Sequence, residues 1–168
     1  MEQQYTSKNT SVNSAKLPAS TKYIPWEKYR GQNVLDYGGG KFDNLKDYLK
    51  KQYNINLYIY DKYNRSPQDN ASALSQTYNL IICNNVLNII KEDSIIKEVI
   101  KDIDNALNED GMACFYIYEC DKSGVGKETK KDCWQRNEVT EAYIRFLQDF
   151  KNVSIKHKII WCRYEKDD

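Results

Sequence analysis

Apolar and polar positions follow one another along the chain in blocks that predict strands and helices in turn. Short apolar runs predict strands at 34–37, 55–60, 78–83, 112–118 and 153–164. Apolar residues at helical spacing predict helices at 43–52, 93–107 and 138–150. This alternation predicts an α/β protein with a Rossmann-like, mostly parallel sheet, helices on both faces and an antiparallel C-terminal strand.

Two segments depart from this alternation. Residues 62–77 are mostly polar and too short for a helix, a strand and a second helix, so we expect a reduced third βα unit. Residues 1–22 are polar and predict an N-terminal arm that is either partly disordered or closes over the cleft. The remaining residues, 23–168, are expected to form a single domain, which the length of 168 residues allows.

Composition narrows the possible partners and location. Lys and Arg number 25 against 24 Asp and Glu, so the charge does not indicate a nucleic-acid partner. No run of about 18 apolar residues is present, so no membrane span is expected. The first residues lack the apolar core of a signal peptide. Five scattered cysteines without a C-x-x-C pair predict reduced thiols in the cytoplasm and no metal site.

The first predicted strand runs into three glycines, Gly38, Gly39 and Gly40. Such a turn lets a ligand approach the backbone closely at the carboxyl end of a parallel strand. A phosphate cradle of the G-x-G-x-x-G type would have glycine at position 43, where this chain has Asp43. A carboxylate there would repel a pyrophosphate but tolerate a cationic ligand, so a nucleotide-cofactor oxidoreductase is disfavoured.

The second predicted strand ends at an acidic residue, Asp61. A carboxylate at this point can accept hydrogen bonds from both hydroxyls of a ribose. Tyr63, two residues further on, could cover an adenine ring. Alternatively, Asp61 only caps a turn; the glycine turn one unit earlier favours the ribose interpretation.

Together these motifs resemble the class I S-adenosylmethionine (SAM)-dependent methyltransferases. Four parts of the chain carry the similarity. Residues 34–40 resemble the family's D-x-G-x-G-x-G turn, and Asp61 its ribose-binding acid. Residues 78–88 resemble its fourth strand and following turn, and 107–112 the turn before its fifth strand. The resemblance implies that the glycine turn contacts the methionine part of SAM, Asp61 the ribose and Tyr63 the adenine. The implied cofactor-binding residues are Asp36, Tyr37, Gly38, Gly39, Gly40, Asp61, Lys62, Tyr63, Asn84 and Asn85. The resemblance also implies that the usual third strand, with its contact to the adenine amino group, is missing or shortened.

The chemistry would need little from the protein besides alignment, because the sulfonium of SAM is already a strong electrophile. Asn84 and Asn85 would lie beside the sulfonium, and Glu119 and Asp121 are the candidates for a base or an acceptor-orienting group. Residues 119–137 form a long polar loop at the end of a strand, so we interpret the loop as an acceptor-binding lid containing Trp134 and Gln135. His157, the one histidine, is expected in the core.

Three functions remain open at this point. The first is methyl transfer from SAM to an unidentified acceptor, with a small molecule slightly favoured over nucleic acid or protein. The second is a non-catalytic, SAM-binding interaction module that acts through a protein partner. The third, disfavoured by Asp43, is the oxidoreductase.

Overall fold

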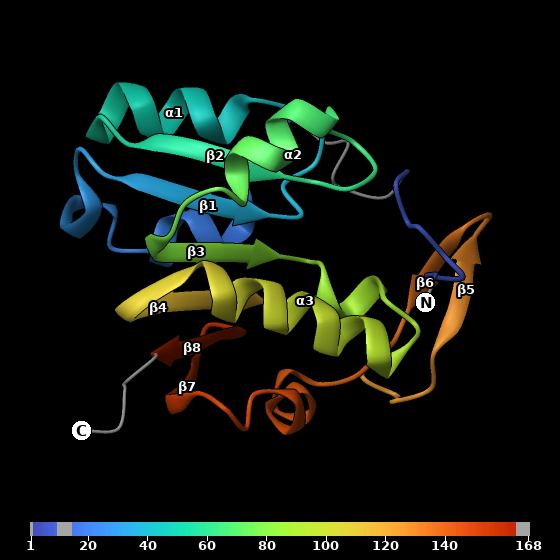
Figure 1. Cartoon of the computed structure of the whole chain (residues 1–168). Coiled ribbons are helices and arrows are strands. Elements are labelled where there is room, and N and C mark those ends of the chain that lie inside the picture. The colour runs from blue at the N-terminus through green and yellow to red at the C-terminus, as the bar shows by residue number, and fades with distance from the viewer. Residues whose placement is uncertain (1, 10–14, 164–168) are drawn as a thin grey trace.

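A computed structural model, which describes residues 2–9 and 15–163, contains a six-stranded sheet in the order β2-β1-β3-β4-β8-β7 (Figure 1). The strands are β1 Asn33–Tyr37, β2 Asn56–Tyr60, β3 Tyr78–Asn84, β4 Leu107–Tyr116, β7 Lys151–Lys156 and β8 Ile159–Arg163. The first four in chain order are parallel, whereas β8 pairs antiparallel with β4 and β7 with β8. The predicted Rossmann-like architecture with an antiparallel C-terminal strand is therefore confirmed.

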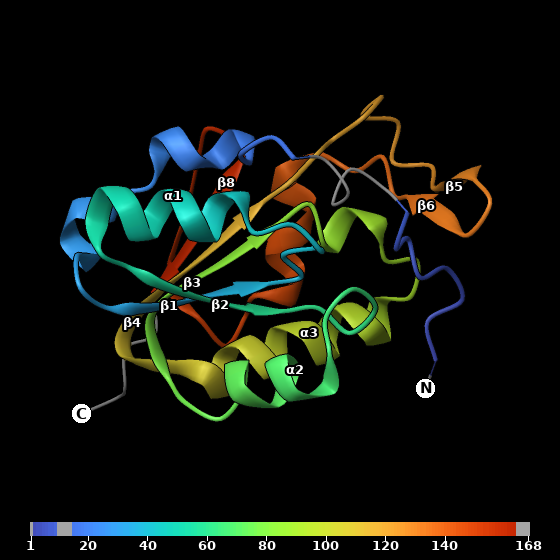
Figure 2. The ribbon, with the colours of Figure 1, turned by 90° about the horizontal axis from the view of Figure 1, so that it is seen from above.

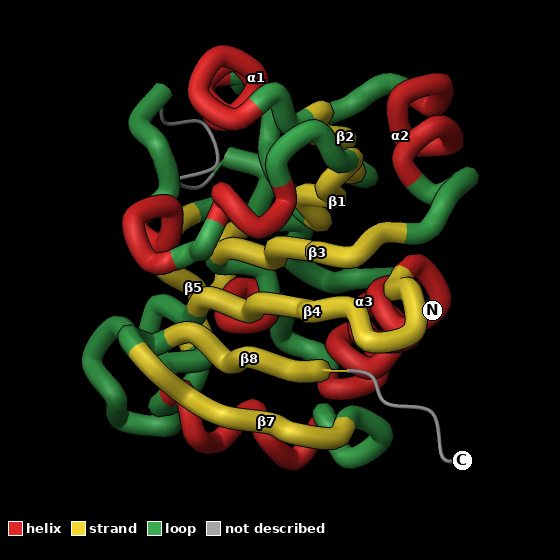
Figure 3. Tube along the Cα trace, turned by 90° about the vertical axis from the view of Figure 1, so that its left-hand side faces the viewer, coloured by secondary structure: helices red, strands yellow, loops and turns green. Residues whose placement is uncertain are grey.

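Helices cover both faces of the sheet (Figures 2 and 3). One face carries α1 (Asn44–Tyr53) and two 3₁₀ helices, Ala19–Tyr23 and Trp26–Tyr29. The other face carries α2 (Pro67–Ala73), α3 (Asp93–Ala106) and the 3₁₀ helix Thr140–Phe146. Each α-helix packs through an apolar stripe at helical spacing, which is Leu45 and Leu49 in α1 and Ile96, Val99 and Ile103 in α3.

The reduced third unit leaves β2 at the edge of the sheet. The chain leaves β2, forms α2 on the same face as α3, and returns directly to β3 beside β1 (Figure 2). The polar stretch 62–77 therefore contains a seven-residue helix. Ser66 caps this helix by accepting a hydrogen bond from the Asp69 amide, and Pro67 occupies its first turn.

The long last strand predicted over 153–164 is wrong in two respects. It is a hairpin of β7 and β8, and the turn residues His157 and Lys158 have φ values of 58° and 60°, as a tight hairpin turn requires. His157 therefore lies exposed at the turn, stacked on Tyr23 with ring centroids 4.0 Å apart, and not in the core. Tyr164 lies outside the described residues.

Two other predictions also need correction. The helix expected over 138–150 is the 3₁₀ helix Thr140–Phe146, followed by an irregular segment. The loop expected over 119–136 contains a small antiparallel hairpin, β5 (Lys127–Lys130) and β6 (Cys133–Gln135). The hairpin contacts the N-terminal arm and the 3₁₀ helix packs against α3, and local patterns encode neither contact.

All five cysteines are free thiols, and four of them are buried. Within residues 2–9 and 15–163, no group of three or more His, Cys, Asp or Glu side chains could hold a metal ion. In the same residues, no helix combines the length and apolar character needed to cross a membrane.

Candidate cofactor site

The glycine turn after β1 is shaped by close backbone contacts. Gly38 and Gly40 have φ values of 80° and 77°, in the left-handed region that glycine adopts without strain. A Cβ atom on Gly39 would lie 2.5 Å from Oδ2 of Asp36, so a larger residue would displace that carboxylate. The Gly38 amide donates to the carbonyl of Tyr60 at 2.6 Å, which joins the turn to the end of β2.

Arg65 holds this turn from the far side. Its Nε donates to the carbonyl of Gly40 at 2.7 Å and its Nη2 to the carbonyl of Phe42 at 2.8 Å. Its Nη1 pairs with the carboxylate of Asp43 at 2.7 Å. Asp43, which precedes α1, makes no side-chain cap to that helix. Asp43 therefore serves as an anchor for Arg65.

A cavity of about 220 Å³, the α1-side pocket, opens beside the turn. Asp36, Gly38, Gly39, Asn84 and Asn85 line it together with 16–19 of the N-terminal segment. Three of its polar atoms are buried and have no hydrogen-bond partner among the described residues: Oδ1 of Asp36, Nδ2 of Asn84 and Oδ1 of Asn85. Because buried polar atoms are normally paired, three unpaired atoms around one cavity indicate a polar ligand.

The carboxyl group of Asp36 has an altered pKa. Burial and, to a smaller extent, the nearby Asp61 carboxylate raise this pKa to about 7, against the opposing effect of Arg65. A cationic group in the pocket would stabilise the ionised form of Asp36, so a cation is the ligand that this residue favours.

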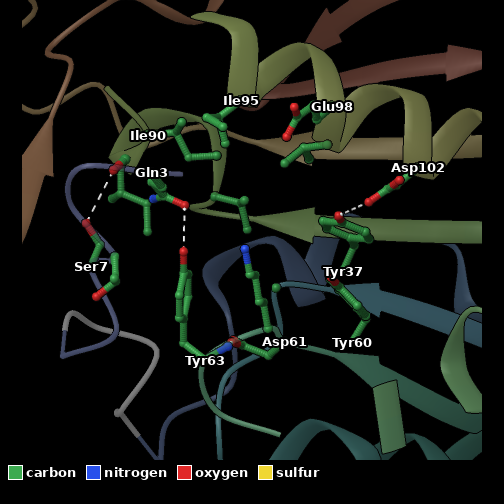
Figure 4. A pocket seen from close by; sticks show the side chains of 16 residues that line it. Gln3, Ser7, Tyr37, Tyr60, Asp61, Tyr63, Ile90, Ile95, Glu98 and Asp102 are labelled. Carbon is green, nitrogen blue, oxygen red and sulfur yellow. Dashed lines mark hydrogen bonds between the residues drawn. The ribbon is translucent and has the colours of Figure 1, made fainter. Parts of the chain in front are cut away.

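A second cavity of about 350 Å³, the α3-side pocket, lies between α3 and the ends of β1 and β2 (Figure 4). Tyr60, Asp61 and Tyr63 line one side, with Lys62 among them. Ile90, Ile95 and Glu98 line the opposite side (Figure 4). The cavity is thus a slot whose two sides combine aromatic or aliphatic side chains with a few polar groups, which suits a flat heterocycle attached to a polar group.

Asp61 already holds several groups of the protein. Its Oδ1 accepts hydrogen bonds from the Tyr63 amide and from both nitrogens of Asn64, at 3.0 to 3.1 Å. Its Oδ2 accepts from the Gly40 amide at 2.9 Å. A carboxylate oxygen has two lone pairs, so Oδ2 retains room for one further donor. Asp61 caps a turn and can bind one ribose hydroxyl, rather than both.

The two pockets meet at Gly38, which lines both. Val86 packs against this glycine so closely that a Cβ atom on Gly38 would lie 2.4 Å from Cγ2 of Val86. Val86 therefore marks the boundary between the pockets, and a ligand that spans both must pass beside it.

The N-terminal arm and the β5–β6 hairpin lie against each other over the α3-side pocket. The amide of Thr6 donates to Oδ1 of Asp132 at 3.0 Å, and Tyr5 stacks on Trp134 at 5.1 Å. Gln3, Thr6 and Ser7 line the pocket, and the Tyr63 hydroxyl donates to Oε1 of Gln3 (Figure 4). Trp134 thus contacts the arm, and the arm contacts the pocket, whereas Gln135 accepts a hydrogen bond from Asn88 at 3.3 Å.

A second part of the N-terminal segment reaches the α1-side pocket. The hydroxyl of Ser20 donates to Oδ1 of Asn84 at 2.6 Å, so the amide nitrogen is the atom of this pocket-lining side chain that lacks a partner among the described residues. The part of the predicted arm between these two segments, 10–14, lies outside the described residues.

Glu119 and Asp121 lie away from both pockets. Burial raises the pKa of Glu119, but hydrogen bonds from Thr140 and the charge of Lys158 outweigh this and hold the pKa below its usual range. Asp121 is exposed and accepts a hydrogen bond from the Ser123 amide at 2.9 Å. Glu119 is therefore a buried structural carboxylate, and the structure brings neither residue to the glycine turn.

Four residues of the site are not predicted by the sequence patterns: Arg65, Ser20, Val86 and Asp102. Asp102 alone has a visible signal, because it interrupts the apolar stripe of Ile95, Val99 and Ala106 in α3. The other three have ordinary sequence surroundings and become recognisable only through tertiary contacts.

No family model and no curated protein matches this chain at the level of sequence. Solved structures match it over most of its length. A SAM-dependent methyltransferase from Clostridium acetobutylicum superposes with a TM-score of 0.57 at 13% identity, covering 83% of this chain and 87% of that one. The 1,6-didemethyltoxoflavin-N1-methyltransferase of Burkholderia thailandensis gives 0.61 at 14%, covering 88% and 80%. The N-methyltransferase NodS of Bradyrhizobium japonicum, in complex with S-adenosylhomocysteine (SAH), gives 0.53 at 12%, covering 98% and 100%. The chain therefore has the fold of the class I SAM-dependent methyltransferases.

Proposed function

We propose that this protein binds SAM and transfers its methyl group to a small molecule. The observation that carries the proposal is the set of three unpaired polar atoms in the α1-side pocket. The methionine end of SAM carries an ammonium, which donates hydrogen bonds, and a carboxylate, which accepts them. Asp36 and Asn85 offer acceptors and Asn84 offers a donor, so the unpaired atoms fit both groups.

The adenosine end would occupy the α3-side pocket. Its ribose would donate one hydroxyl to Oδ2 of Asp61, and its adenine would lie in the slot beyond Tyr63, against Ile95 and with its amino group toward α3. The part of the cofactor between methionine and ribose would then pass over Gly38, which lines both pockets. Its sulfonium would come beside Val86 and Asn85.

The protein's contribution to the reaction would be alignment. When bound, SAM supplies an electrophilic methyl group, and the protein holds that group in line with the attacking atom. We expect neither Glu119 nor Asp121 to accept a proton, because both lie away from the glycine turn. An acceptor that attacks as a neutral amine needs no base until after transfer.

The neighbours' names and the charge balance favour a small acceptor. The Burkholderia neighbour methylates N1 of 1,6-didemethyltoxoflavin and was solved with that small molecule bound. The near-balance of 25 basic and 24 acidic residues does not support a polyanionic acceptor. We place the reaction in the cytoplasm, where five unpaired thiols are stable.

A second candidate function is a SAM-binding module that acts through a protein partner without catalysis. The close packing of Val86 against Gly38 favours it, because this contact narrows the path between the pockets. A narrow path between the pockets is compatible with a cofactor that binds without reaching an acceptor.

Calorimetric titration with SAM and SAH tests the proposal directly. We expect both to bind to the wild type, and binding to weaken at least tenfold in Asn84→Ala, which removes the unpaired donor. Asn79→Ala, at the far end of β3, is the matched control and should bind normally. Binding followed by label transfer in an acceptor screen would support the enzyme, and binding without any transfer would support the module. A well-folded wild type that binds neither ligand would refute both.

A further inference from the structure

The missing third unit removes the element that would follow β2 at the edge of the sheet. The connection that replaces it offers no free acceptor to a nucleobase in the α3-side pocket. Its Lys62 lines the pocket and lies over the ring of Tyr63, but an ammonium carries donors only. The acceptors and amides nearby already bind the protein. Asn64 donates to Asp61, Arg65 binds the glycine turn, and Asn70 exchanges hydrogen bonds with the main chain of Asp61. Any group that recognises the edge of the base must come from elsewhere in the α3-side pocket.

Helix α3 supplies two carboxylates to that pocket. Glu98 and Asp102 lie one turn apart on the side of the helix that faces the slot (Figure 4). The hydroxyl of Tyr37 donates to Oδ2 of Asp102 at 2.6 Å. Burial and this hydrogen bond raise the pKa of Tyr37 well above its usual value, so the hydroxyl stays protonated and holds the carboxylate in place.

The polar groups of the arm at the other end of the slot are already paired. Thr6 binds Asp132, and Oε1 of Gln3 accepts from Tyr63. Among the described groups that line the slot, the carboxylates of α3 are therefore the acceptors best placed to receive a further donor.

We propose that Asp102, held by Tyr37, recognises the exocyclic amino group of the cofactor's adenine, with Glu98 as a second acceptor nearer the mouth. The inference rests on the proposed function and assigns to α3 the recognition that the absent unit cannot provide. A carboxylate accepts a hydrogen bond from the amino group of adenine and repels the carbonyl oxygen that replaces it in hypoxanthine. The site should therefore discriminate between the two bases.

The test is calorimetric titration with SAH and with S-inosylhomocysteine, in which an oxygen replaces the amino group at C6. We expect the wild type to bind SAH at least tenfold more tightly. Asp102→Asn keeps an oxygen for Tyr37 and turns an amide donor toward the base, so the preference should vanish or reverse. Glu98→Gln should reduce it by a smaller factor, and Asp104→Asn, on the same helix outside the pocket, should leave it unchanged.

The outcomes separate this inference from the proposed function. A wild type that binds SAH and the inosine compound equally, or an Asp102→Asn variant that keeps the full preference, would overturn the role of α3 and leave SAM binding intact. A folded wild type that binds neither compound would remove the cofactor assignment itself, and this inference with it.

Discussion

The two pockets on either side of Gly38 differ in how their polar groups are satisfied. In the α1-side pocket, three buried polar atoms from Asp36, Asn84 and Asn85 have no partner among the described residues. In the α3-side pocket, Asp61 binds neighbouring main chain and Tyr37 binds Asp102. The first pocket therefore depends on a ligand to satisfy it, whereas the second is already organised and needs a ligand mainly to fill its slot.

Replacing the carboxylate of the unsatisfied pocket should have the largest effect on binding. Asp36→Asn removes the negative charge that faces the ammonium of SAM, and we expect affinity for SAM and SAH to fall about a hundredfold to a thousandfold. Calorimetry at pH 8 measures this. Asp47→Asn makes the same change from carboxylate to amide at an exposed position on α1, and it is the control. A variant that keeps wild-type affinity would show that the ammonium binds elsewhere.

The same substitution should stabilise the unliganded protein at alkaline pH. The pKa of Asp36 is about 7 in the folded protein, against 3.8 for the ordinary group. Between these values the folded chain keeps a proton that the unfolded chain releases, so stability is lost as pH rises from about 4 to about 7. Asp36→Asn escapes this loss, and we expect it to exceed the wild type by about 4 kcal/mol at pH 8.

Urea unfolding of both proteins at pH 4.5 and pH 8 measures that difference. The difference between the variant and the wild type should be small at the lower pH and should reach its full size above pH 7. A difference that stays constant across this range would mean that Asp36 titrates normally.

The boundary between the pockets can be tested by a double-mutant cycle. Gly38→Ala should destabilise the protein by about 1–2 kcal/mol, because its φ is 80° and its new methyl group would meet Val86. In a Val86→Ala background, the part of this cost that comes from the clash should disappear. Urea unfolding of the four proteins gives the coupling free energy. Strict additivity would mean that backbone strain alone explains the requirement for glycine.

The two pockets also differ in how far the sequence predicts them. Asp36, the three glycines and Asn84 lie at the ends of the neighbouring parallel strands β1 and β3, so an apolar pattern that locates the strands also brings these residues together. The α3-side pocket takes Gln3 and Ser7 from the arm and Asp102 from a helix. These come together only through packing over long sequence separations, which a periodic pattern does not contain.

The incorrect predictions of secondary structure also arise from features that a periodic pattern does not contain. The turn at His157 is read as strand because a chain of alternating apolar residues looks continuous, and two residues with positive φ are enough to reverse it. The 3₁₀ helix Thr140–Phe146 carries apolar residues at nearly helical spacing, but its first turn is held by Glu119, which accepts from both the amide and the hydroxyl of Thr140. The side chain of Glu119, in the loop that follows β4, thus fixes the start of a segment 21 residues later.

Loosening the arm over the organised pocket should have the smallest effect. Asp132→Ala removes the carboxylate that binds the amide and hydroxyl of Thr6, and both groups are close to solvent, so we expect less than about 1 kcal/mol of lost stability. The arm covers the α3-side pocket, however, so SAH should dissociate about three- to tenfold faster while its association changes little.

Stopped-flow displacement of SAH measures the dissociation rate. The fluorescence of Trp134, which stacks on Tyr5 of the arm, is the signal that follows it. Asp121→Ala, in the same loop but bound to Ser123, is the control and should dissociate like the wild type. Equal rates in all three proteins would mean that the pocket retains its ligand without the arm, and the difference between the two pockets would then lie in their walls alone.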